Sequence, residues 1–535
     1  MRGWAWVFGI LLGLLPVKPL WFAGGAALVG LYALLVRRER PLFGRVFLAY
    51  VVLGAGGQLL APDPLVAELD PPWTSARAPV VNWIPRDGLS DLRGWNPKDG
   101  AGGFATLTPD GFWRVPRVHP RTGRPFTEVL SSRKYPVRAG EVVTESFYFR
   151  HDGTRAGFHV SFFTARGHHP VPVRVVELGN GWKRAYASYE VQPGDRWVRA
   201  VDLVRLEGDW TYLEIGYAQL EPGPAPSAYV PGSAREDGRW ARAGWWLGTG
   251  VLGLLVLHGS RFLLGVVGLR AAGVAVLLGF LVHAGVALEQ YRAWSYAWEP
   301  RVVGWTIQPN FLGHLGVVSA ALVWVLAGSG LGAVAFGVAL GLVWLSKSRA
   351  ALVGALALGV GWGVTVLRVR RGLGLALLVG VLGLAGFLVS QGGALGRLGT
   401  VFDPSYGTTR ARLEIWGVAW RAFLEHPLTG IGVNRFEAYY AMHRPSDVGG
   451  ALVPHAHNLV LGVLAEGGAL GFLGFVVLWG SVVLALVRRR AWPAVVLVGV
   501  AFVLNLADYT WFAGEVYYPL WVGVAAALRG TRGVT

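Results

Sequence analysis

The sequence has 535 residues, of which 53% are hydrophobic and 15% are charged, and its mean hydropathy is +0.44. A soluble protein of this size carries more charge, so this composition predicts a helical membrane protein. The net charge of +17 would suggest nucleic acid in a soluble protein, but here we attribute it to membrane topology and to affinity for anionic lipid or phosphate groups, and expect no nucleic acid partner. The absence of cysteine excludes disulfides, thiol catalysis and cysteine metal sites.

Apolar runs of membrane-spanning length predict about twelve transmembrane helices. They lie near residues 4–17, 19–36, 43–61, 243–258, 271–288, 311–328, 331–346, 350–367, 373–390, 458–487, 492–508 and 515–529. We do not interpret the first run as a cleaved signal peptide, because another span follows almost at once and no small-residue cleavage site separates the two.

Arginines in alternate loops predict the orientation of the spans. They are Arg37, Arg38, Arg40, Arg45, Arg261, Arg270, Arg368, Arg370, Arg371, Arg488, Arg489, Arg490, Arg529 and Arg532. By the positive-inside rule their side is the cytoplasm, so both termini are expected there and segments 62–242, 289–310 and 391–457 are expected outside. Arg349 is an outward exception, which either snorkelling to lipid headgroups or a bound phosphate would explain.

Residues 62–242 are richer in glycine, proline and polar residues than the rest of the chain. Within them, hydrophobic residues alternate with period two at 142–149, 158–163, 186–191 and 197–201. Such runs, separated by turn residues, predict an antiparallel β-sandwich. The end of the segment, residues 217–231, resembles the last strand of jelly-roll carbohydrate-binding modules. Trp182, Trp197 and Trp210 are candidates either for stacking on sugar rings or for the core of this domain, and both interpretations stay open.

Polar residues gather at the outward ends of four predicted elements. They are Asn310 before the sixth span, Ser348 and Arg349 before the eighth, Arg410, Arg412 and Trp416 at the start of an amphipathic stretch, and His455, His457 and Asn458 before the tenth. The amphipathic stretch places Leu413, Trp416, Trp420, Phe423 and Leu424 on one helical face. We expect this helix to end at Pro427 and to lie along the membrane surface.

The residues around His457 point to acid–base chemistry at a membrane boundary. The positive end of a helix dipole favours a neutral imidazole, which can accept a proton from an attacking hydroxyl. Arg349 with Arg412, or Arg410, can hold a diphosphate and stabilise the charge that develops as it leaves. His455 is a candidate to share or replace the role of His457, and Asn310, Ser348 and Trp416 are candidate supporting residues.

Two glycines follow the histidine at helical spacing. Gly468 and Gly471 return to within about 40° of the face of His457 on a continuous helix. Small residues there would let another helix approach closely beneath the site. Glu466 would point to the opposite face and would not orient the histidine, unless the helix breaks at Gly467 and Gly468.

These motifs resemble the O-antigen ligase and O-antigen polymerase superfamily of bacterial membrane glycosyltransferases. His457-Asn458, followed after nine residues by Gly468-Ala469-Leu470-Gly471, is similar to the ligase motif. Ser348-Arg349, Arg412 with Trp416, and the run 426–432 also resemble family positions, and the resemblance covers about residues 300–475.

The resemblance implies a GT-C-like fold and an undecaprenyl-diphosphate-linked glycan donor. It implies transfer without metal or cofactor at the outer face of the bacterial inner membrane, in surface polysaccharide or lipopolysaccharide biosynthesis. It also implies that His457 is the base or orients the acceptor, assisted by Asn458, and that Arg349 and Arg412 bind the diphosphate. The insert at 62–242 departs from the family and leaves the acceptor open between a lipid A core, another lipid-linked glycan, as in a polymerase, and a protein hydroxyl.

The predicted organisation has five parts. They are the first three spans at 1–61, the β-sandwich at 62–242, spans four to nine at 243–390, an outward catalytic loop with an amphipathic helix at 391–457, and the last three spans at 458–535. A transporter of lipid-linked sugars would be expected to carry charge pairs within its spans, and these spans are nearly free of charge. A membrane-anchored glycan receptor would need far fewer spans. The sequence therefore favours the enzyme.

Overall fold

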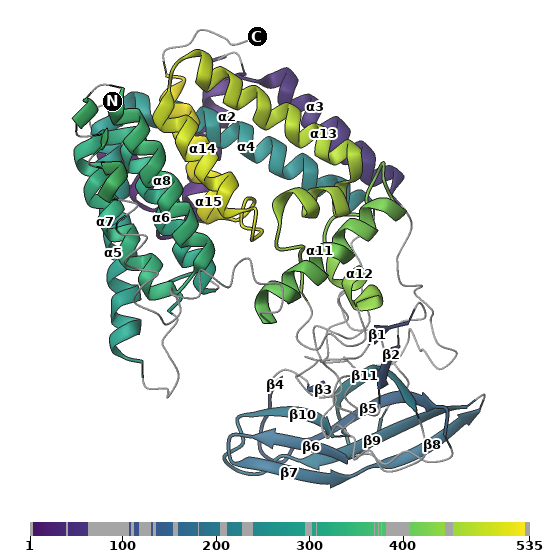
Figure 1. The fold of residues 1–535 in the computed structure, drawn as a ribbon. Helices are drawn as coiled ribbons and strands as arrows, with labels where there is room; N and C mark the ends of the chain where they lie inside the picture. Colours follow the sequence, from purple (N-terminus) through teal and green to yellow (C-terminus); the bar gives the residue numbers. More distant parts are fainter. Residues whose placement is uncertain are drawn as a thin grey trace.

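The computed structural model describes most of the chain (Figure 1). The described residues are 4–38, 41–61, 106–108, 112–116, 130–131, 135–153, 159–179, 181–203, 211–226, 239–294, 302–306, 308–368, 370–372, 374–375, 377–380, 383, 407–444 and 453–529.

The apolar runs form helices at nearly the expected positions. They are α1 (Trp4–Gly13), α2 (Pro19–Leu35), α3 (Gly44–Leu60), α4 (Arg239–Val267), α5 (Leu269–Arg292), α6 (Pro309–Ala327), α7 (Ser329–Ser346), α8 (Arg349–Leu367), α13 (Leu459–Arg488), α14 (Trp492–Leu504) and α15 (Gly514–Ala527). Six helices of the described part, α4 to α8 and α13, are long and apolar enough to cross a membrane, whereas α2, α3 and α14 are apolar but shorter. The ninth expected span, 373–390, lies mostly outside the described residues, so the count of about twelve spans stays a prediction.

Helix α6 is the most enclosed of these six helices. Its apolar window is 83% buried inside the protein, compared with 39–50% for the other five. It packs against α5, α7, α8, α14 and α15. Because its sides are covered by other helices, its first turn can hold polar residues in a defined position at one end of the bundle.

The described residues between α3 and α4 form two antiparallel sheets. The strands are β1 (Thr106–Leu107), β2 (Trp113–Pro116), β3 (Leu130–Ser131), β4 (Tyr135–Pro136), β5 (Val142–His151), β6 (His159–Thr164), β7 (Gly167–Pro172), β8 (Arg174–Gly179), β9 (Trp182–Glu190), β10 (Trp197–Leu203) and β11 (Tyr212–Pro222). One sheet has the order β1-β2-β11-β5-β9-β8, and the other has the order β3-β10-β6-β7 with β4 also paired to β10. The four alternating runs of the sequence correspond to β5, β6, β9 and β10, so the all-β, antiparallel expectation is confirmed for these residues.

One face of the six-stranded sheet is apolar and the other is polar. Phe147 and Ile215 on the apolar face are fully buried, and Tyr189 stacks on Phe162 of the second sheet with ring centroids 5.4 Å apart. On the polar face Arg114 and Arg150 both bind the buried carboxylate of Glu214. The alternation follows from the strand geometry, in which successive side chains point to opposite faces.

The tryptophans proposed for sugar stacking have different surroundings. Trp182 is half-buried, stacks on Phe112 with centroids 4.0 Å apart, and lies under the guanidinium of Arg150 at 4.5 Å. These contacts favour the structural interpretation for Trp182. Trp197 is half-buried, and Trp210 lies outside the described residues. Glycan binding by this region stays a prediction, as does its relation to jelly-roll modules.

Two further helices, α11 (Gly407–Glu425) and α12 (Phe436–His443), lie between the bundle and the sheets (Figure 1). The buried residues of α11 pack against α12 and the loop before it, and they are Ile415, Val418, Ala419 and Ala422. The helix ends before Pro427, as expected. Leu413, Trp420 and Leu424 instead remain 46%, 47% and 60% exposed. This second apolar stripe fits contact with a membrane surface, which stays a prediction.

Helix α13 is interrupted at Gly468, where φ is 61° and ψ is −165°. The segment 427–432 fits into this break. The carbonyls of Ala465 and Glu466 accept the N–H groups of Ile431 and Gly432, and the N–H groups of Ala469 and Leu470 donate to the carbonyls of Pro427 and Leu428. The break at Gly467 and Gly468 that the sequence left open is therefore present, and Gly468 accommodates a loop rather than the neighbouring helix expected there. Gly471 does pack against another helix, at Trp246 of α4.

The break at Gly468 predicts that a larger residue there destabilises the protein. A Cβ atom at Gly468 would lie 2.4 Å from the Gly430 nitrogen and 2.5 Å from the Leu428 carbonyl, and φ is positive, so Gly468→Ala is expected to cost roughly 1–3 kcal/mol or more. The measurement is the midpoint of thermal unfolding in detergent. Gly480→Ala on the same helix is the matched control, because a Cβ there meets no atom within 4 Å. Equal losses for the two variants would contradict this account.

Candidate functional site

The site begins at the start of α13. Asn458 is the residue that caps this helix, and its Oδ1 accepts the N–H of Leu461 at 3.0 Å. Its Nδ2 donates to the carbonyl of Leu506 at 2.9 Å, and Leu459 donates its N–H to the carbonyl of Asn505 at 2.8 Å. Both ends of the Asn458 amide are thus engaged with backbone. The start of α13 is held against the loop between α14 and α15.

His457 precedes this cap in the left-handed conformation, with φ of 48°. That backbone is uncommon for a non-glycine residue and marks a constrained position. Ala456 is fully buried in the cluster that joins α11 to α12. Because Ala456 is anchored there, the two flanking histidines are held at the boundary between the α11–α12 unit and the bundle.

Asp508, from the loop between α14 and α15, orients His457. Nδ1 of His457 lies 3.4 Å from Oδ1 of Asp508, whose side chain is almost completely buried. The N–H of Tyr509 donates to Oδ1 at 2.9 Å and Nδ2 of Asn310 donates to Oδ2 at 2.9 Å. Burial alone would raise the pKa of the Asp508 carboxyl, but the hydrogen bond from His457, the attraction to His314 and His457 in their protonated forms, and the Tyr509 amide hold it below its usual range.

An ionised Asp508 determines which nitrogen of His457 carries the proton. A carboxylate only accepts, so Nδ1 of His457 is the donor and Nε2 keeps its lone pair. His457 is half-buried, with 24% of its side chain exposed. The ring therefore presents an acceptor nitrogen at a position that solvent or substrate can reach.

His455 supports His457 through the backbone. Its Nδ1 accepts the N–H of His457 at 3.4 Å, and the two rings meet edge to face with centroids 4.4 Å apart. Its ring also lies 5.4 Å from that of Tyr509. Burial, with a smaller contribution from His457, lowers the pKa of His455 to about 4. His455, His457 and Asp508 each offer one ligand atom, and these atoms all lie within 4.8 Å of one another, so this trio is the group that could hold a metal ion within the described part of the chain.

Asn310 and Ser348 are brought together at one end of α6. Asn310 lies in its first turn and reaches Asp508, as described above. Ser348 is buried, and its Oγ accepts the N–H of Ala351 to cap α8. A Cβ at Gly313 of α6 would lie 3.2 Å from the Ser348 Cβ, so glycine there permits this close approach. Arg349, half-buried, therefore starts α8 beside the helix that carries Asn310.

The two arginines of α11 differ in their surroundings. Arg410 forms an ion pair with Glu414, one turn later, at 2.9 Å. The Arg412 side chain is half-buried and lies close enough for its charge to act on His314 of α6. Among the described residues no hydrogen bond or ion pair of the Arg412 side chain is found. Trp416, one turn further along α11, has a buried indole N–H with no hydrogen-bond partner in the described part.

Sequence reasoning missed Asp508 and His314. His314 is fully buried in α6, and its Nδ1 lies 2.7 Å from Oγ1 of Thr510. The available signal for Asp508 was an acid at the predicted outward end of an apolar run, and for His314 a histidine one turn inside the sixth span. Glu466 points away from His457, as its position on the opposite helical face predicted. Its Oε1 accepts the N–H of Phe436 at the start of α12.

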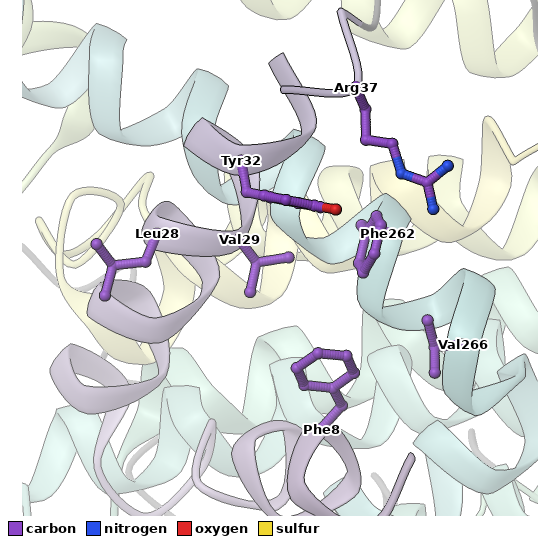
Figure 2. A pocket seen from close by; sticks show the side chains of 7 residues that line it. All are labelled: Phe8, Leu28, Val29, Tyr32, Arg37, Phe262 and Val266. Carbon is purple, nitrogen blue, oxygen red and sulfur yellow. The ribbon is translucent and has the colours of Figure 1, made fainter. Parts of the chain in front are cut away.

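A separate hydrophobic groove of about 520 Å³ lies between α1, α2 and α4. Figure 2 shows the rings of Phe8, Tyr32 and Phe262 around it, with the Arg37 side chain at one edge. None of the seven residues that line it belongs to the candidate site. Its apolar lining offers few convergent polar groups, so it does not compete with the site at His457.

The fold and the site define a membrane protein with many apolar helices, in which His457 at the start of α13 meets Asp508, and Asp508 meets Asn310 of α6. Residues 315–476 match the family model described as O-antigen ligase. The predicted resemblance to the O-antigen ligase superfamily is thus confirmed over this segment, which runs from α6 into α13. The match supports a role in surface polysaccharide biosynthesis. No curated protein matches the chain. Asn310 and Asp508 lie on either side of the matched segment.

Proposed function

We propose that this protein is a glycosyltransferase that moves a glycan from an undecaprenyl-diphosphate-linked donor to an acceptor hydroxyl at the outer face of the bacterial inner membrane. The observation that carries the proposal is the contact of His457 with the buried carboxylate of Asp508, which also accepts a hydrogen bond from Asn310 of α6. We assign the diphosphate to Arg349, which starts α8, and to Arg412 of α11, whose charge acts on His314 of α6. The match to the O-antigen ligase family supports the same chemistry.

The transfer is a displacement at the anomeric carbon of the donor. The acceptor oxygen forms a bond to this carbon while the bond to the diphosphate oxygen breaks, and that electron pair leaves with the polyprenyl diphosphate. Nε2 of His457 accepts the acceptor proton. Arg349 and Arg412 stabilise the negative charge that develops on the diphosphate, and Trp416 can donate a further hydrogen bond. No step uses a metal or a cofactor.

Several residues act through His457. Asp508 is a positioning residue that holds the reactive tautomer, and Asn310 in turn fixes the carboxylate. Asn458 positions the histidine by capping α13, which is a more indirect role than the catalytic one expected from the sequence. His455 restrains the backbone of His457. Ser348 positions Arg349 in the same way, because it caps α8, the helix that begins at this arginine.

The proposed layout follows the charge bias of the loops. Both termini lie in the cytoplasm, the spans lie at 1–61, 243–390 and 458–535, and the segments 62–242 and 391–457 lie outside. Helix α12 contacts strand β1, so the all-β region lies next to the catalytic segment and is in place to handle an acceptor or a growing glycan. Membrane lipids and a lipid or glycan acceptor are the expected partners.

The test is a reconstituted reaction with purified protein, a synthetic polyprenyl-diphosphate oligosaccharide, a panel of acceptors and a chelator. We expect release of polyprenyl diphosphate and formation of a glycosylated acceptor with the chelator present. A single addition indicates a ligase, and a ladder of products indicates the alternative, a polymerase of the same superfamily. Movement of labelled donor across the bilayer without any product would reject the transferase and favour transport.

A further inference from the structure

The trio of His455, His457 and Asp508 has the dimensions of a transition-metal site. Nδ1 of His457 and Oδ1 of Asp508 are 3.4 Å apart, and all three ligand atoms lie within 4.8 Å of one another. A tetrahedral ion with bonds of about 2.0 Å needs ligand atoms roughly 3.3 Å apart. One pair already has this separation, and the His455 ring has to move toward the other two ligand atoms, from at most 4.8 Å, to complete the set.

Two of the three ligands, Asp508 and His457, are held by contacts that do not involve an ion. Asp508 is fixed by the Asn310 amide and the Tyr509 N–H, and the backbone on either side of His457 is fixed by Ala456 and the Asn458 cap. Both histidines are half-buried, so an ion can reach them from solvent. Two imidazoles and one carboxylate suit Zn²⁺ and related first-row ions, and three protein ligands leave a fourth position for water.

We propose that His455, His457 and Asp508 bind a divalent transition-metal ion such as Zn²⁺, and that the bound ion switches off transfer. The inhibitory part rests on the proposed function, whereas the binding part does not. An ion on Nδ1 of His457 leaves the ring proton on Nε2, and an ion on Nε2 uses its lone pair. In either case the ring has no nitrogen left to accept the acceptor proton, and Asp508 is drawn to the ion.

Binding is tested first, without substrate, on protein freed of any histidine tag. Titration with Co²⁺, followed by its visible absorption and by competition with Zn²⁺, is expected to give one ion per chain. His455→Ala and Asp508→Asn are each expected to weaken binding at least tenfold. His168→Ala, which alters an exposed histidine of strand β7, is the matched control and is expected to bind like wild type. Unchanged affinity in both site variants would overturn the site.

A second measurement needs no variant, so it stays decisive if either one fails to fold. Diethyl pyrocarbonate labelling of the wild-type chain, located by mass spectrometry, is expected to fall at His455 and His457 when Zn²⁺ is added, and to stay constant at His168. Equal labelling with and without Zn²⁺ would also overturn the site.

Inhibition is tested in the reconstituted reaction. Zn²⁺ is expected to lower wild-type turnover at least tenfold over the concentration range in which it binds, and a chelator is expected to restore it. Stimulation by Zn²⁺, or no change at saturating ion, would overturn the inhibitory part. If wild type shows no turnover with any acceptor, the proposed function fails, and the binding and labelling results still decide whether the metal site exists.

Discussion

His457→Ala is expected to lower the rate of polyprenyl diphosphate release by about 10²–10⁴-fold, the usual contribution of a general base. Donor binding is expected to stay close to wild type, because the diphosphate is assigned to arginines of other elements. The loss is expected in turnover rather than in the donor KM, since the interaction that disappears develops only in the transition state.

The measurement combines initial rates in the presence of a chelator with donor binding to the same preparations. His168→Ala serves as the matched histidine control, and a wild-type-like melting temperature shows that the variant is folded. Alanine at 457 removes the ring that contacts His455 and Asp508, so a second variant, His457→Gln, keeps a polar side chain there. Turnover near the wild-type rate in both variants would reject His457 as the base.

Arg412→Ala is expected to lower kcat/KM by about 10²–10³-fold, which is the size of the effect when one preorganised donor to a developing anion is removed. The sequence left Arg410 and Arg412 as alternatives. Arg410 is engaged with Glu414 in an exposed pair one helical turn apart, whereas the charge of Arg412 acts on His314 at the α6 side of the site. Arg410→Ala is therefore expected to stay within about threefold of wild type, because such surface pairs contribute little.

The two variants are compared in the same reconstituted assay, with donor binding measured alongside. Arg412→Lys is expected to recover part of the loss, because lysine keeps the charge but not the two-pronged geometry of a guanidinium. A large loss in Arg410→Ala with little change in Arg412→Ala would assign the phosphate to Arg410. Small effects in both would leave the diphosphate to Arg349 and remove α11 from the binding site.

The sequence predicted those helix and strand boundaries that depend on interactions between neighbouring residues. The start of α13 follows from an asparagine before a long apolar run, because a side-chain cap reaches only three residues along the chain. Strands β5, β6, β9 and β10 follow from period-two alternation, because each strand of a sandwich has one face against the core. The end of α11 before Pro427 follows from the conformational limits of proline.

Packing decided which face of α11 is buried. The apolar face expected from the sequence included Leu413, Trp420 and Leu424, which are exposed, whereas the buried contacts are made by smaller side chains such as Ala419 and Ala422. An amphipathic pattern shows that a helix has an apolar side, but a second apolar stripe cannot be assigned to the core or to a membrane without its neighbours.

By itself, the sequence determined a polytopic membrane protein with an inserted all-β region, a histidine at the start of α13 and arginines on two other elements. Only the tertiary structure brought Asp508 to His457 across 51 positions, and only it showed that the segment 427–432 fills the break at Gly468. The physical reason is the same in both cases. Helix starts and strand alternation depend on neighbours in the chain, whereas a hydrogen bond between distant segments depends on how all the helices between them pack.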